Sequence, residues 1–465
     1  MMRDLDSTSD PRTDETRMTG SADPGRCAHR MRMWPALPLA FFLATGCTRL
    51  PTDAAGGRAA RGAATASDLA PTAHVSDVIV QIEPGSDVDS VASAFNSQVL
   101  DVIPELSLAL LRTPASLTAS AFVGGLQSDS RVLFSESNAM VETAEAAQST
   151  VAFCEATRTW SDVEDQTALT RVGAAEAQAY GRGEGALVAI LDTGIDLDHP
   201  ALAGVLDLPG IEVGAAGAAG DDRPEGVDTN LDGIVDGSLG HGTHVAGIVH
   251  AVAPGARLLP VRVLDSDGIG RAFRVAQGIV AAMESGADVI NLSLGLPSES
   301  RAIQAALDLA RSAGIVVVAA AGNSDVSTLD FPAAYPPVLA VAGTDPDDRK
   351  APFSDFGGDV DLAAPAVGIL STYWDGTYAR WSGTSMASPF VAGTAALLYG
   401  RLGPRSPATA GLIEQLILAG AESLASSDPV YGGLLGAGRL SAAGSVARSL
   451  DNGGQEAEPR DRLPH

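Results

Sequence analysis

The chain has 465 residues, a formal net charge of −27 and 45% hydrophobic residues. This length allows two to four domains, and the apolar content is ample for a large buried core. The acidic charge argues against nucleic acid or an anionic lipid surface as a partner, because both need a basic face. Three cysteines, Cys27, Cys47 and Cys154, are too few and too scattered for a disulfide framework or a zinc site.

The first 47 residues predict an export signal. Residues 1–30 are polar and lack hydrophobic periodicity, so we interpret them as disordered or as an over-extended start. The apolar run 34–44 is too short to span a bilayer but suits the core of a signal peptide. The following Leu43-Ala44-Thr45-Gly46-Cys47 resembles a bacterial lipoprotein box and predicts a lipid on Cys47. The alternative is a plain secretory signal with an incidental cysteine.

A small domain of mixed structure is predicted between two linkers. Residues 48–75 are rich in Ala, Gly, Thr and Ser, which is typical of a flexible tether. Residues 76–138 predict an α+β domain with strands and helices that alternate along the chain. Its strands are expected at 77–82, 106–112 and 131–138, and its helices at 88–96 and 117–127. Residues 139–158 are rich in Ala, Glu, Gln, Ser and Thr and predict a second linker.

The longest region, residues 159–450, alternates apolar strands with helices. Runs typical of buried strands occur at 187–192, 257–264, 288–294, 315–320 and 338–343. Helical patterns occur at 242–251, 272–285, 299–313, 384–400 and 409–418. This alternation indicates an α/β fold in which a parallel sheet carries helices on both faces. In such sheets, ligands lie outside the carboxyl ends of the strands. Residues 451–465 predict a disordered acidic tail.

Ser385 lies where one of these helices begins. It belongs to Gly383-Thr384-Ser385-Met386-Ala387-Ser388-Pro389, which runs directly into an apolar helical pattern. The first turn of a helix presents free amide groups and the positive end of the helix dipole, which stabilise a developing oxyanion. The position therefore suits a nucleophile. An N-capping serine is the alternative.

Partners for such a nucleophile lie upstream. A serine hydroxyl becomes reactive when a histidine takes its proton and a carboxylate orients that histidine. The chain offers His241 in Gly240-His241-Gly242-Thr243-His244, and Asp192 at the end of an apolar strand, Ala189-Ile190-Leu191-Asp192. These three motifs, in the order Asp, His, Ser, resemble those of the subtilisin-like serine peptidases (subtilases). The resemblance implies a subtilisin-like sheet, Asp192 as orienting carboxylate, His241 as general base and then acid, and Ser385 as nucleophile.

The resemblance also implies roles for residues around the triad. Asn323 would donate its side-chain amide to the oxyanion, with the Ser385 amide as the second donor. Backbone groups of Ser293, Leu294 and Gly295 would bind a substrate strand along one edge, with Gly268 and Gly270 facing its other edge. Ordinary turn chemistry is the alternative for these segments. His244 lacks the i, i+4 histidine pair and the glutamate of a zincin site, which favours a packed helix residue.

An α+β domain before a subtilase catalytic region resembles the family's inhibitory propeptide. Such a domain assists folding and lays its C-terminal tail in the active-site cleft, which makes it a partner in cis. A spacer or adhesion domain is the alternative for residues 76–138. If the domain is a propeptide, the linker at 139–158 is the natural place for a maturation cut.

One loop predicts a calcium site. Residues 228–236 place oxygen side chains at alternate positions before Gly233, as the first half of an EF-hand loop does. The expected ligands are the side chains of Asp228, Asn230, Asp232 and Asp236 and the backbone carbonyl of Ile234. The closing bidentate glutamate is absent, with Leu239 at its place. A solvated acidic turn is the alternative.

We therefore predict a serine endopeptidase, secreted or anchored at the surface of a bacterial-type cell, made as a self-processing precursor and acting on polypeptides as a monomer. Catalysis needs no cofactor, and any calcium would be structural. An α/β-hydrolase esterase is excluded because position 387 is Ala and the serine comes last in the chain order. A catalytically silent binding protein on a subtilase scaffold remains the alternative.

Overall fold

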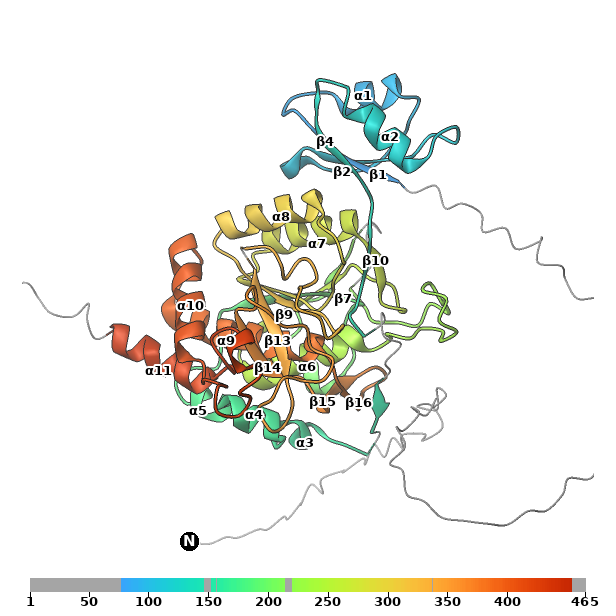
Figure 1. The fold of residues 1–465 in the computed structure, drawn as a ribbon. Helices are drawn as coiled ribbons and strands as arrows, with labels where there is room; N and C mark the ends of the chain where they lie inside the picture. The colour runs from blue at the N-terminus through green and yellow to red at the C-terminus, as the bar shows by residue number, and fades with distance from the viewer. Residues whose placement is uncertain (1–76, 146–151, 156, 214–219, 337, 454–465) are drawn as a thin grey trace, which may run out of the picture. The chain divides into compact units, whose positions relative to one another are not determined.

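A computed structural model describes residues 77–145, 152–155, 157–213, 220–336 and 338–453 (Figure 1). The predicted signal peptide with Cys47, the linker 48–75 and most of the tail lie outside these ranges. The helix α11 (Ala442–Gly453) enters the range predicted as tail, so the helical region ends slightly later than expected. Within the described ranges, no helix combines the length and the apolar character needed to cross a bilayer.

The N-terminal domain is a four-stranded antiparallel sheet with two helices, in the strand order β2-β3-β1-β4. Its strands are β1 (Val78–Ile82), β2 (Val99–Ile103), β3 (Leu108–Leu111) and β4 (Val132–Ser137). Its helices are α1 (Val88–Ala94) and α2 (Ala119–Leu126). Each helix begins where a side chain accepts a backbone N–H, from Asp87 for α1 and from Thr118 for α2.

The sequence misses strand β2. Its pairing with β3 shifts register between Val99 and Asp101, so the strand contains an irregularity where regular alternation is expected. Val102 is exposed and Ile103 is buried, and the other three residues are half-buried. A strand with this pattern carries little of the period-2 signal from which strands are recognised.

The large sheet lies in residues 159–450, and we call it the catalytic-region sheet after the role predicted for this range. It has seven parallel strands in the order β14-β13-β12-β11-β7-β9-β8. The strands are β7 (Leu187–Asp192), β8 (Ile211–Glu212), β9 (Arg257–Arg262), β11 (Val289–Leu292), β12 (Val316–Ala320), β13 (Leu339–Thr344) and β14 (Leu362–Pro365). The bounds of β7 match the prediction. The sequence misses the edge strands β8 and β14, which are too short to show a pattern.

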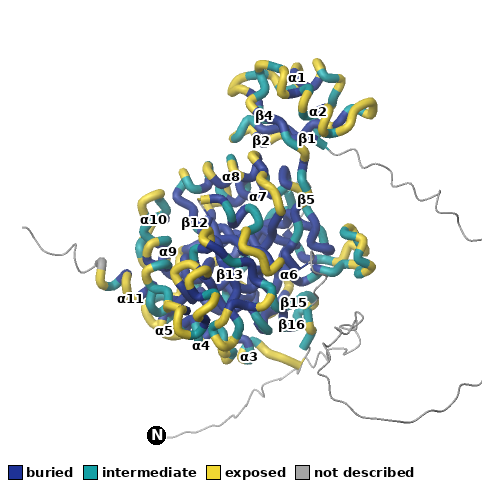
Figure 2. The backbone as a smooth tube through the Cα atoms, viewed as in Figure 1, coloured by how far each residue is buried: buried dark blue, intermediate teal, exposed yellow. Residues whose placement is uncertain are grey.

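Helices cover both faces of this sheet. The main helices are α6 (His241–Val252), α7 (Ala272–Glu284), α8 (Arg301–Ser312), α9 (Thr384–Leu402) and α10 (Pro407–Gly420). Alternate residues of β7 divide between two cores: Val188 and Ile190 pack with α6 and α9, while Ala189 and Leu191 pack with α7 and α8. The strands from β14 to β7 are buried along their whole length, and Figure 2 shows the sheet interior in dark blue, while the edge strand β8 is half-buried. The predicted α/β class is therefore confirmed.

Three short helices precede the sheet, and a small second sheet combines one strand from before it with two strands from after it. The helices are α3 (Trp160–Glu164), α4 (Thr167–Val172) and α5 (Ala174–Gln178). The second sheet joins β15 (Ile369–Tyr373), β16 (Thr377–Trp381) and β6 (Phe153–Cys154) in antiparallel pairs. None of these elements is long enough for a helical or strand period to stand out in the sequence.

The N-terminal domain packs against α7 and α8. Side chains from its sheet, Ile79, Ile103 and Phe134 among them, join the core that contains these two helices. The Glu136 carboxylate accepts hydrogen bonds from Arg301 N at 2.8 Å and Ala302 N at 3.2 Å, at the first turn of α8. A carboxylate at a helix N-terminus satisfies free amides and favours the helix dipole. Both apolar and electrostatic contacts therefore fix the domain here.

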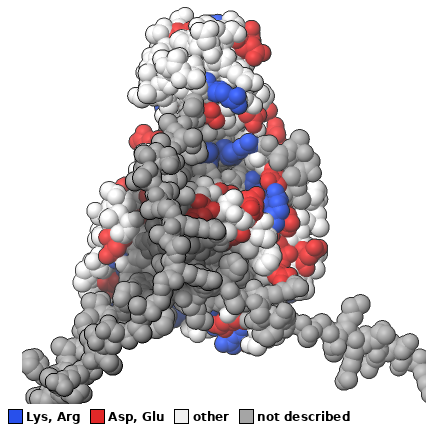
Figure 3. Space-filling model, turned by 90° about the vertical axis from the view of Figure 1, so that its right-hand side faces the viewer, with Lys and Arg blue, Asp and Glu red and all other residues white. Residues whose placement is uncertain are grey.

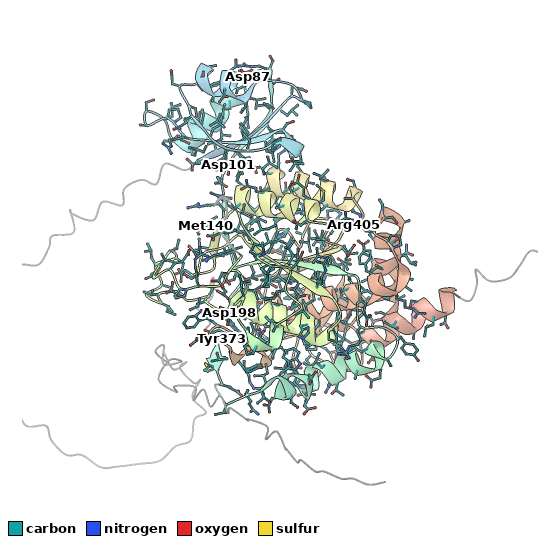
Figure 4. The ribbon with its side chains drawn as sticks, turned by 180° about the vertical axis from the view of Figure 1, so that it is seen from behind. Asp87, Asp101, Met140, Asp198, Tyr373 and Arg405 are labelled. Carbon is teal, nitrogen blue, oxygen red and sulfur yellow. The ribbon has the colours of Figure 1, made fainter. Side chains whose placement is uncertain are left out.

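The range 139–158 is not a structureless linker. It contains the strand β5 (Met140–Glu142), which pairs antiparallel with β10 (Ile269–Arg271), and it also contains β6. Figure 4 labels Met140, the first residue of β5. The composition of this range misleads because β5 takes its hydrogen bonds from the catalytic region rather than from its own neighbours in sequence.

Charged side chains are mixed on the face shown in Figure 3. Outside the grey residues, acidic and basic groups lie among uncharged ones, and neither sign forms a continuous patch there. Elsewhere in the described residues, acidic groups are paired with basic ones, as in the bridge of 2.6 Å between Arg311 and Glu414. Pairs of this kind at the surface contribute little to stability individually.

Candidate active site

Asp192 and His241 form a buried hydrogen bond. Asp192 is the last residue of β7, at the carboxyl edge of the sheet, and its Oδ1 lies 2.7 Å from His241 Nδ1. Both side chains are fully buried. The backbone N–H of Thr193 also donates to Asp192 Oδ1, at 2.8 Å. The carboxylate is thus held in place and fixes the orientation of the imidazole ring.

The start of α6 positions His241. Its N-cap, Gly240, has φ of 85°, and a Cβ there would overlap the ring of Tyr373. Glycine is therefore required for both conformation and space. The indole of Trp381 packs edge-on against the imidazole, with ring centroids 5.2 Å apart. His244, on the next turn, is buried with Nε2 at 3.1 Å from two backbone carbonyls, as expected for a packed helix residue.

Ser385 is the second residue of α9 and is fully buried. Its backbone carbonyl accepts a hydrogen bond of 2.9 Å from Ser293 Oγ, and Asn291 Nδ2 donates to that same Oγ at 2.9 Å. Ser293 therefore connects the end of β11 to the start of α9. This contact gives Ser293 a structural role in addition to the backbone role that the sequence predicts.

Asn323 follows β12, and its amide is oriented by Thr384. Asn323 Oδ1 accepts hydrogen bonds of 2.9 Å from both Thr384 N and Thr384 Oγ1. With the oxygen satisfied in this way, the Nδ2 group points to the centre of the site. An amide donor held in advance stabilises a developing oxyanion without reorganisation. The sequence identifies Asn323 but misses this role of Thr384.

The strand β5 lies between two backbone segments predicted to bind substrate. On one side, Glu142 N donates to Gly295 O at 3.0 Å, and Gly295 N donates to Glu142 O at 2.8 Å. On the other side, β5 pairs with Gly270 and its neighbours, and Thr143 N donates to Gly268 O at 3.0 Å. Leu294 is buried between these contacts and Ser293. The segment 139–145, which contains β5 and which we call the tail strand, therefore occupies the predicted peptide-binding groove.

Gly268 is required by this close approach. It has φ of 81°, and a Cβ there would lie 2.8 Å from Thr143 Oγ1 and would overlap Ser238 Oγ. Any other residue would be strained at this φ and would crowd the side chains of Thr143 and Ser238. Glycine at this point therefore leaves room for the Thr143 side chain.

The carboxylate of Glu145 lies at the centre of the site. Its Oε2 accepts a hydrogen bond of 2.5 Å from Ser385 Oγ and lies 3.1 Å from His241 Nε2. Its Oε1 accepts a hydrogen bond of 3.0 Å from Asn323 Nδ2. The sequence places Glu145 in the linker and gives no signal for it, because nothing in its composition distinguishes it from its neighbours. Three side chains from distant parts of the chain thus meet at one carboxylate.

Charge on the carboxylates sets the protonation of His241. Burial by itself disfavours the imidazolium, but Asp192 and Glu145 outweigh burial and raise the pKa of His241 to about 10. Burial also opposes ionisation of Glu145, but the hydrogen bonds from His241, Ser385 and Asn323 hold the pKa of that carboxyl below its usual value. At neutral pH the two groups are therefore an ion pair.

A second buried carboxylate, Asp222, lies behind the first turn of α6. Its Oδ2 accepts a hydrogen bond of 2.8 Å from Thr243 Oγ1, and Thr243 Oγ1 in turn accepts from Asp196 N at 2.9 Å. Burial raises the pKa of Asp222 to about 7, and the nearby charge of Asp192 adds to this effect. No sequence motif marks this residue, which becomes recognisable only through its position behind His241.

The loop at 228–236 is closed by its own side chains. Asp228 Oδ2 accepts from Gly233 N at 3.2 Å, and Asp232 Oδ1 accepts from Ile234 N at 2.7 Å. Asp236 differs from the expectation, because its Oδ1 accepts from Gly226 N at 2.8 Å and from other backbone amides outside the loop. Within the described ranges, no three His, Cys, Asp or Glu side chains form a group that could hold a metal ion. The carboxylates thus do not gather as expected, and calcium binding stays a prediction.

The sequence matches two family descriptions. Residues 183–438 match the "Subtilase family", and residues 62–138 match the "Fervidolysin N-terminal prodomain". These two regions contain the catalytic-region sheet and the N-terminal α+β domain.

Known proteins agree with this assignment. The chain is 43% identical over 240 residues to subtilisin BL of Lederbergia lenta, covering 50% of this chain and 82% of that protein. It is 37% identical over 339 residues to the M-protease of Shouchella clausii, covering 70% and 78%. Among solved structures, it resembles fervidolysin of Fervidobacterium pennivorans, a keratinolytic enzyme related to subtilisin, with a TM-score of 0.64 and 24% identity. That match covers 80% of this chain and 61% of the fervidolysin chain and concerns the fold.

The buried position of Asp222 predicts a pH-dependent stability. The pKa of Asp222 rises from 3.8 to about 7 on folding, so the folded protein loses stability as pH rises between these values, where only the unfolded chain ionises. Asp222→Asn removes this loss. Relative to Ser385→Ala alone, the stability of the double variant Ser385→Ala/Asp222→Asn should increase from about pH 4 to about pH 7, by on the order of a few kcal/mol, and the difference should stay constant above about pH 7. Thermal unfolding across this range measures the difference, and a difference independent of pH would contradict the assignment.

Proposed function

The chain belongs to the subtilase family and is a serine endopeptidase, and we propose that Asp192, His241 and Ser385 form its catalytic triad. The observation that carries the proposal is the convergence of groups on the Glu145 carboxylate. Ser385 Oγ and His241 Nε2 both contact Oε2, and Asn323 Nδ2 contacts Oε1. A nucleophile, a base and an oxyanion donor around one carbon is the arrangement that peptide hydrolysis needs.

With a peptide carbonyl in place of that carboxylate, each group has a defined step. His241 Nε2 takes the Ser385 hydroxyl proton as Oγ bonds to the carbonyl carbon, and the carbonyl oxygen becomes an oxyanion. Asn323 Nδ2 and the Ser385 backbone N–H donate to that oxyanion. Loss of one such donor costs on the order of 3–4 kcal/mol of transition-state stabilisation. The Asp192 carboxylate stabilises the imidazolium that forms.

Collapse of this intermediate breaks the carbon–nitrogen bond. His241 gives its proton to the departing amine, which leaves an ester between Ser385 and the acyl part of the substrate. A water molecule then attacks the ester, with His241 taking the water proton and returning it to Ser385 Oγ. No cofactor takes part in either half of the reaction.

We propose that substrates bind as the tail strand does. Glu142 and Thr143 exchange backbone hydrogen bonds with Gly295 and Gly268, which adds a strand to the edges of the groove. Backbone pairing makes the groove tolerant of sequence, because any polypeptide carries the same donors and acceptors. Val141 is fully buried in the core that contains α7. This burial supports a preference of the groove for an apolar substrate side chain at the position that Val141 occupies, three residues before Ala144.

The same register supports a maturation cut between Ala144 and Glu145. Glu142 bonds to Gly295 and Thr143 to Gly268, so Ala144 is the next residue on the side of Ser293 and Ser385. With this pairing kept, the Ala144 carbonyl is therefore the one that can reach Ser385 once the Glu145 carboxylate has left the site. On this basis the N-terminal domain is a propeptide that assists folding and then inhibits.

We also propose export and anchoring. The apolar run 34–44 and the small residues before Cys47 support an exported protein that carries a lipid on Cys47. Its partners are then polypeptide substrates, its own propeptide and the membrane that holds the lipid, with a monomer as the working form.

The first prediction from the proposed function concerns the nucleophile. Ser385→Ala should abolish hydrolysis of casein or peptides, by about a million-fold for a subtilase-type triad. A sulfonyl fluoride should inactivate the mature wild type and add its mass to the peptide that contains Ser385. The exposed Ser312→Ala serves as control and should behave as wild type. Hydrolysis by Ser385→Ala at the wild-type rate contradicts the mechanism.

The second prediction concerns processing. Purified wild-type precursor should cut itself between Ala144 and Glu145 at a rate independent of protein concentration, since the tail lies in its own cleft. Ser385→Ala should stay at full length in a host without other proteases. Mass spectrometry of both fragments locates the cut. Processing of Ser385→Ala would contradict self-cleavage. A wild-type cut elsewhere within 139–158 would contradict only the cleavage position between Ala144 and Glu145.

The third prediction concerns calcium. Millimolar calcium should raise the Tm of Ser385→Ala through the loop at 228–236, because Asp228 Oδ1 is buried and accepts no hydrogen bond. Binding should be weak, nearer the roughly 10⁻⁴–10⁻³ M of extracellular modules, since the bidentate glutamate is absent and Asp236 is engaged elsewhere. The comparison is with Asp228→Ala/Asp232→Ala in the same background. An equal calcium-dependent rise in Tm in both proteins would show that the loop is only an acidic turn.

A further inference from the structure

We infer that the Glu145 side chain is an intramolecular inhibitor, which holds the uncut precursor inactive and must leave the catalytic centre before the chain cuts itself. The inference rests on the proposed function and goes beyond it. A propeptide that inhibits only by backbone pairing would present its scissile carbonyl to Ser385. Here a side-chain carboxylate takes that place.

The carboxylate engages the catalytic groups one by one. Ser385 Oγ donates to Oε2 at 2.5 Å, so the nucleophile's proton is directed to Glu145 rather than to His241. His241 Nε2 contacts the same oxygen at 3.1 Å, and Asn323 Nδ2 donates to Oε1 at 3.0 Å. The nucleophile, the base and the oxyanion donor are thus all occupied by one group that cannot react.

Space excludes a second occupant. The Glu145 carboxylate is fully buried, and a Cβ added to Gly383 would overlap its Oε1. The same added atom would lie 3.0 Å from Asn323 Nδ2. A site this tight around the carboxylate has no room for a peptide carbonyl beside it. The Ala144 carbonyl and the Glu145 carboxylate therefore occupy the oxyanion position alternately.

Charge favours the inhibited arrangement. Among the described residues, His241 from α6 faces Glu145, and Asp192 from β7 lies behind His241. Charge-assisted hydrogen bonds in a buried site are stronger than neutral ones. An imidazolium between two carboxylates also lacks the free Nε2 lone pair that a general base needs. The carboxylate thus blocks the oxyanion position and disables the base together.

The account predicts that self-cleavage is limited by the departure of Glu145. Full-length wild type, Glu145→Gln and Glu145→Ala are refolded by dilution, and the loss of full-length chain is followed by electrophoresis and mass spectrometry. Glu145→Ala should cut itself about ten- to a hundredfold faster than wild type, the range expected for losing a charge-assisted hydrogen bond. Glu145→Gln, of the same shape but uncharged, should fall between them. Glu105→Gln, an exposed glutamate of the same domain, should match wild type.

Residue 145 also follows the scissile bond, so its direct effect on cleavage is measured separately. The mature enzyme is given two peptides that carry Val-Glu-Thr-Ala followed by Glu or by Ala. The inhibitor role requires the ratio of self-cleavage rates, Glu145→Ala over wild type, to exceed the ratio of kcat/KM values for the two peptides. Equal ratios, or self-cleavage of Glu145→Ala no faster than wild type, overturn the inference. A mature enzyme inactive on both peptides refutes the proposed function itself.

Discussion

Backbone pairing of β5 with β10 and with Gly295 is the constraint on which the functional arrangement depends. It holds Glu142 and Thr143 by backbone hydrogen bonds of 2.8 to 3.0 Å that do not depend on side chains. A slip of one residue would exchange the faces to which alternate side chains point. Val141 would then leave its buried position, and the Glu145 carboxylate would leave Ser385. Pairing therefore determines both which bond reaches the nucleophile and which group blocks it.

The rest of the site is assembled from element ends around that strand. The parallel sheet brings Asp192 and Asn323 to its carboxyl edge, and the helices α6 and α9 supply His241 and Ser385 at their N-terminal turns. Each of these side chains is held by a further contact, such as that of Thr384 with Asn323 Oδ1. The groups are thus fixed before substrate arrives, which is the condition for electrostatic stabilisation of a transition state.

The sequence predicts the parts that repeat a strong local pattern and misses those that depend on distant pairing. The β7 strand is recognisable because burial on both faces makes it almost continuously apolar, and α8 is recognisable because its buried residues recur with the helical period. The position of β5 is not, since its partners lie more than a hundred residues away in the chain. Glu145 and Asp222 are ordinary acidic residues in sequence, and only the fold brings Glu145 to Ser385 and His241 and buries Asp222 against Thr243. Asp236 shows the reverse, because a ligand-like spacing there serves backbone amides instead.

The most direct test of the account is amide hydrogen exchange in the full-length Ser385→Ala precursor, which the proposed mechanism requires to stay uncut. The amides of Glu142, Thr143 and Gly295 donate the hydrogen bonds that seat the tail in the groove. The account predicts that all three exchange as slowly as amides within the central strand β11. Exchange of Glu142 and Thr143 at the rate of an unstructured peptide would contradict it, because the tail would then not occupy the substrate groove.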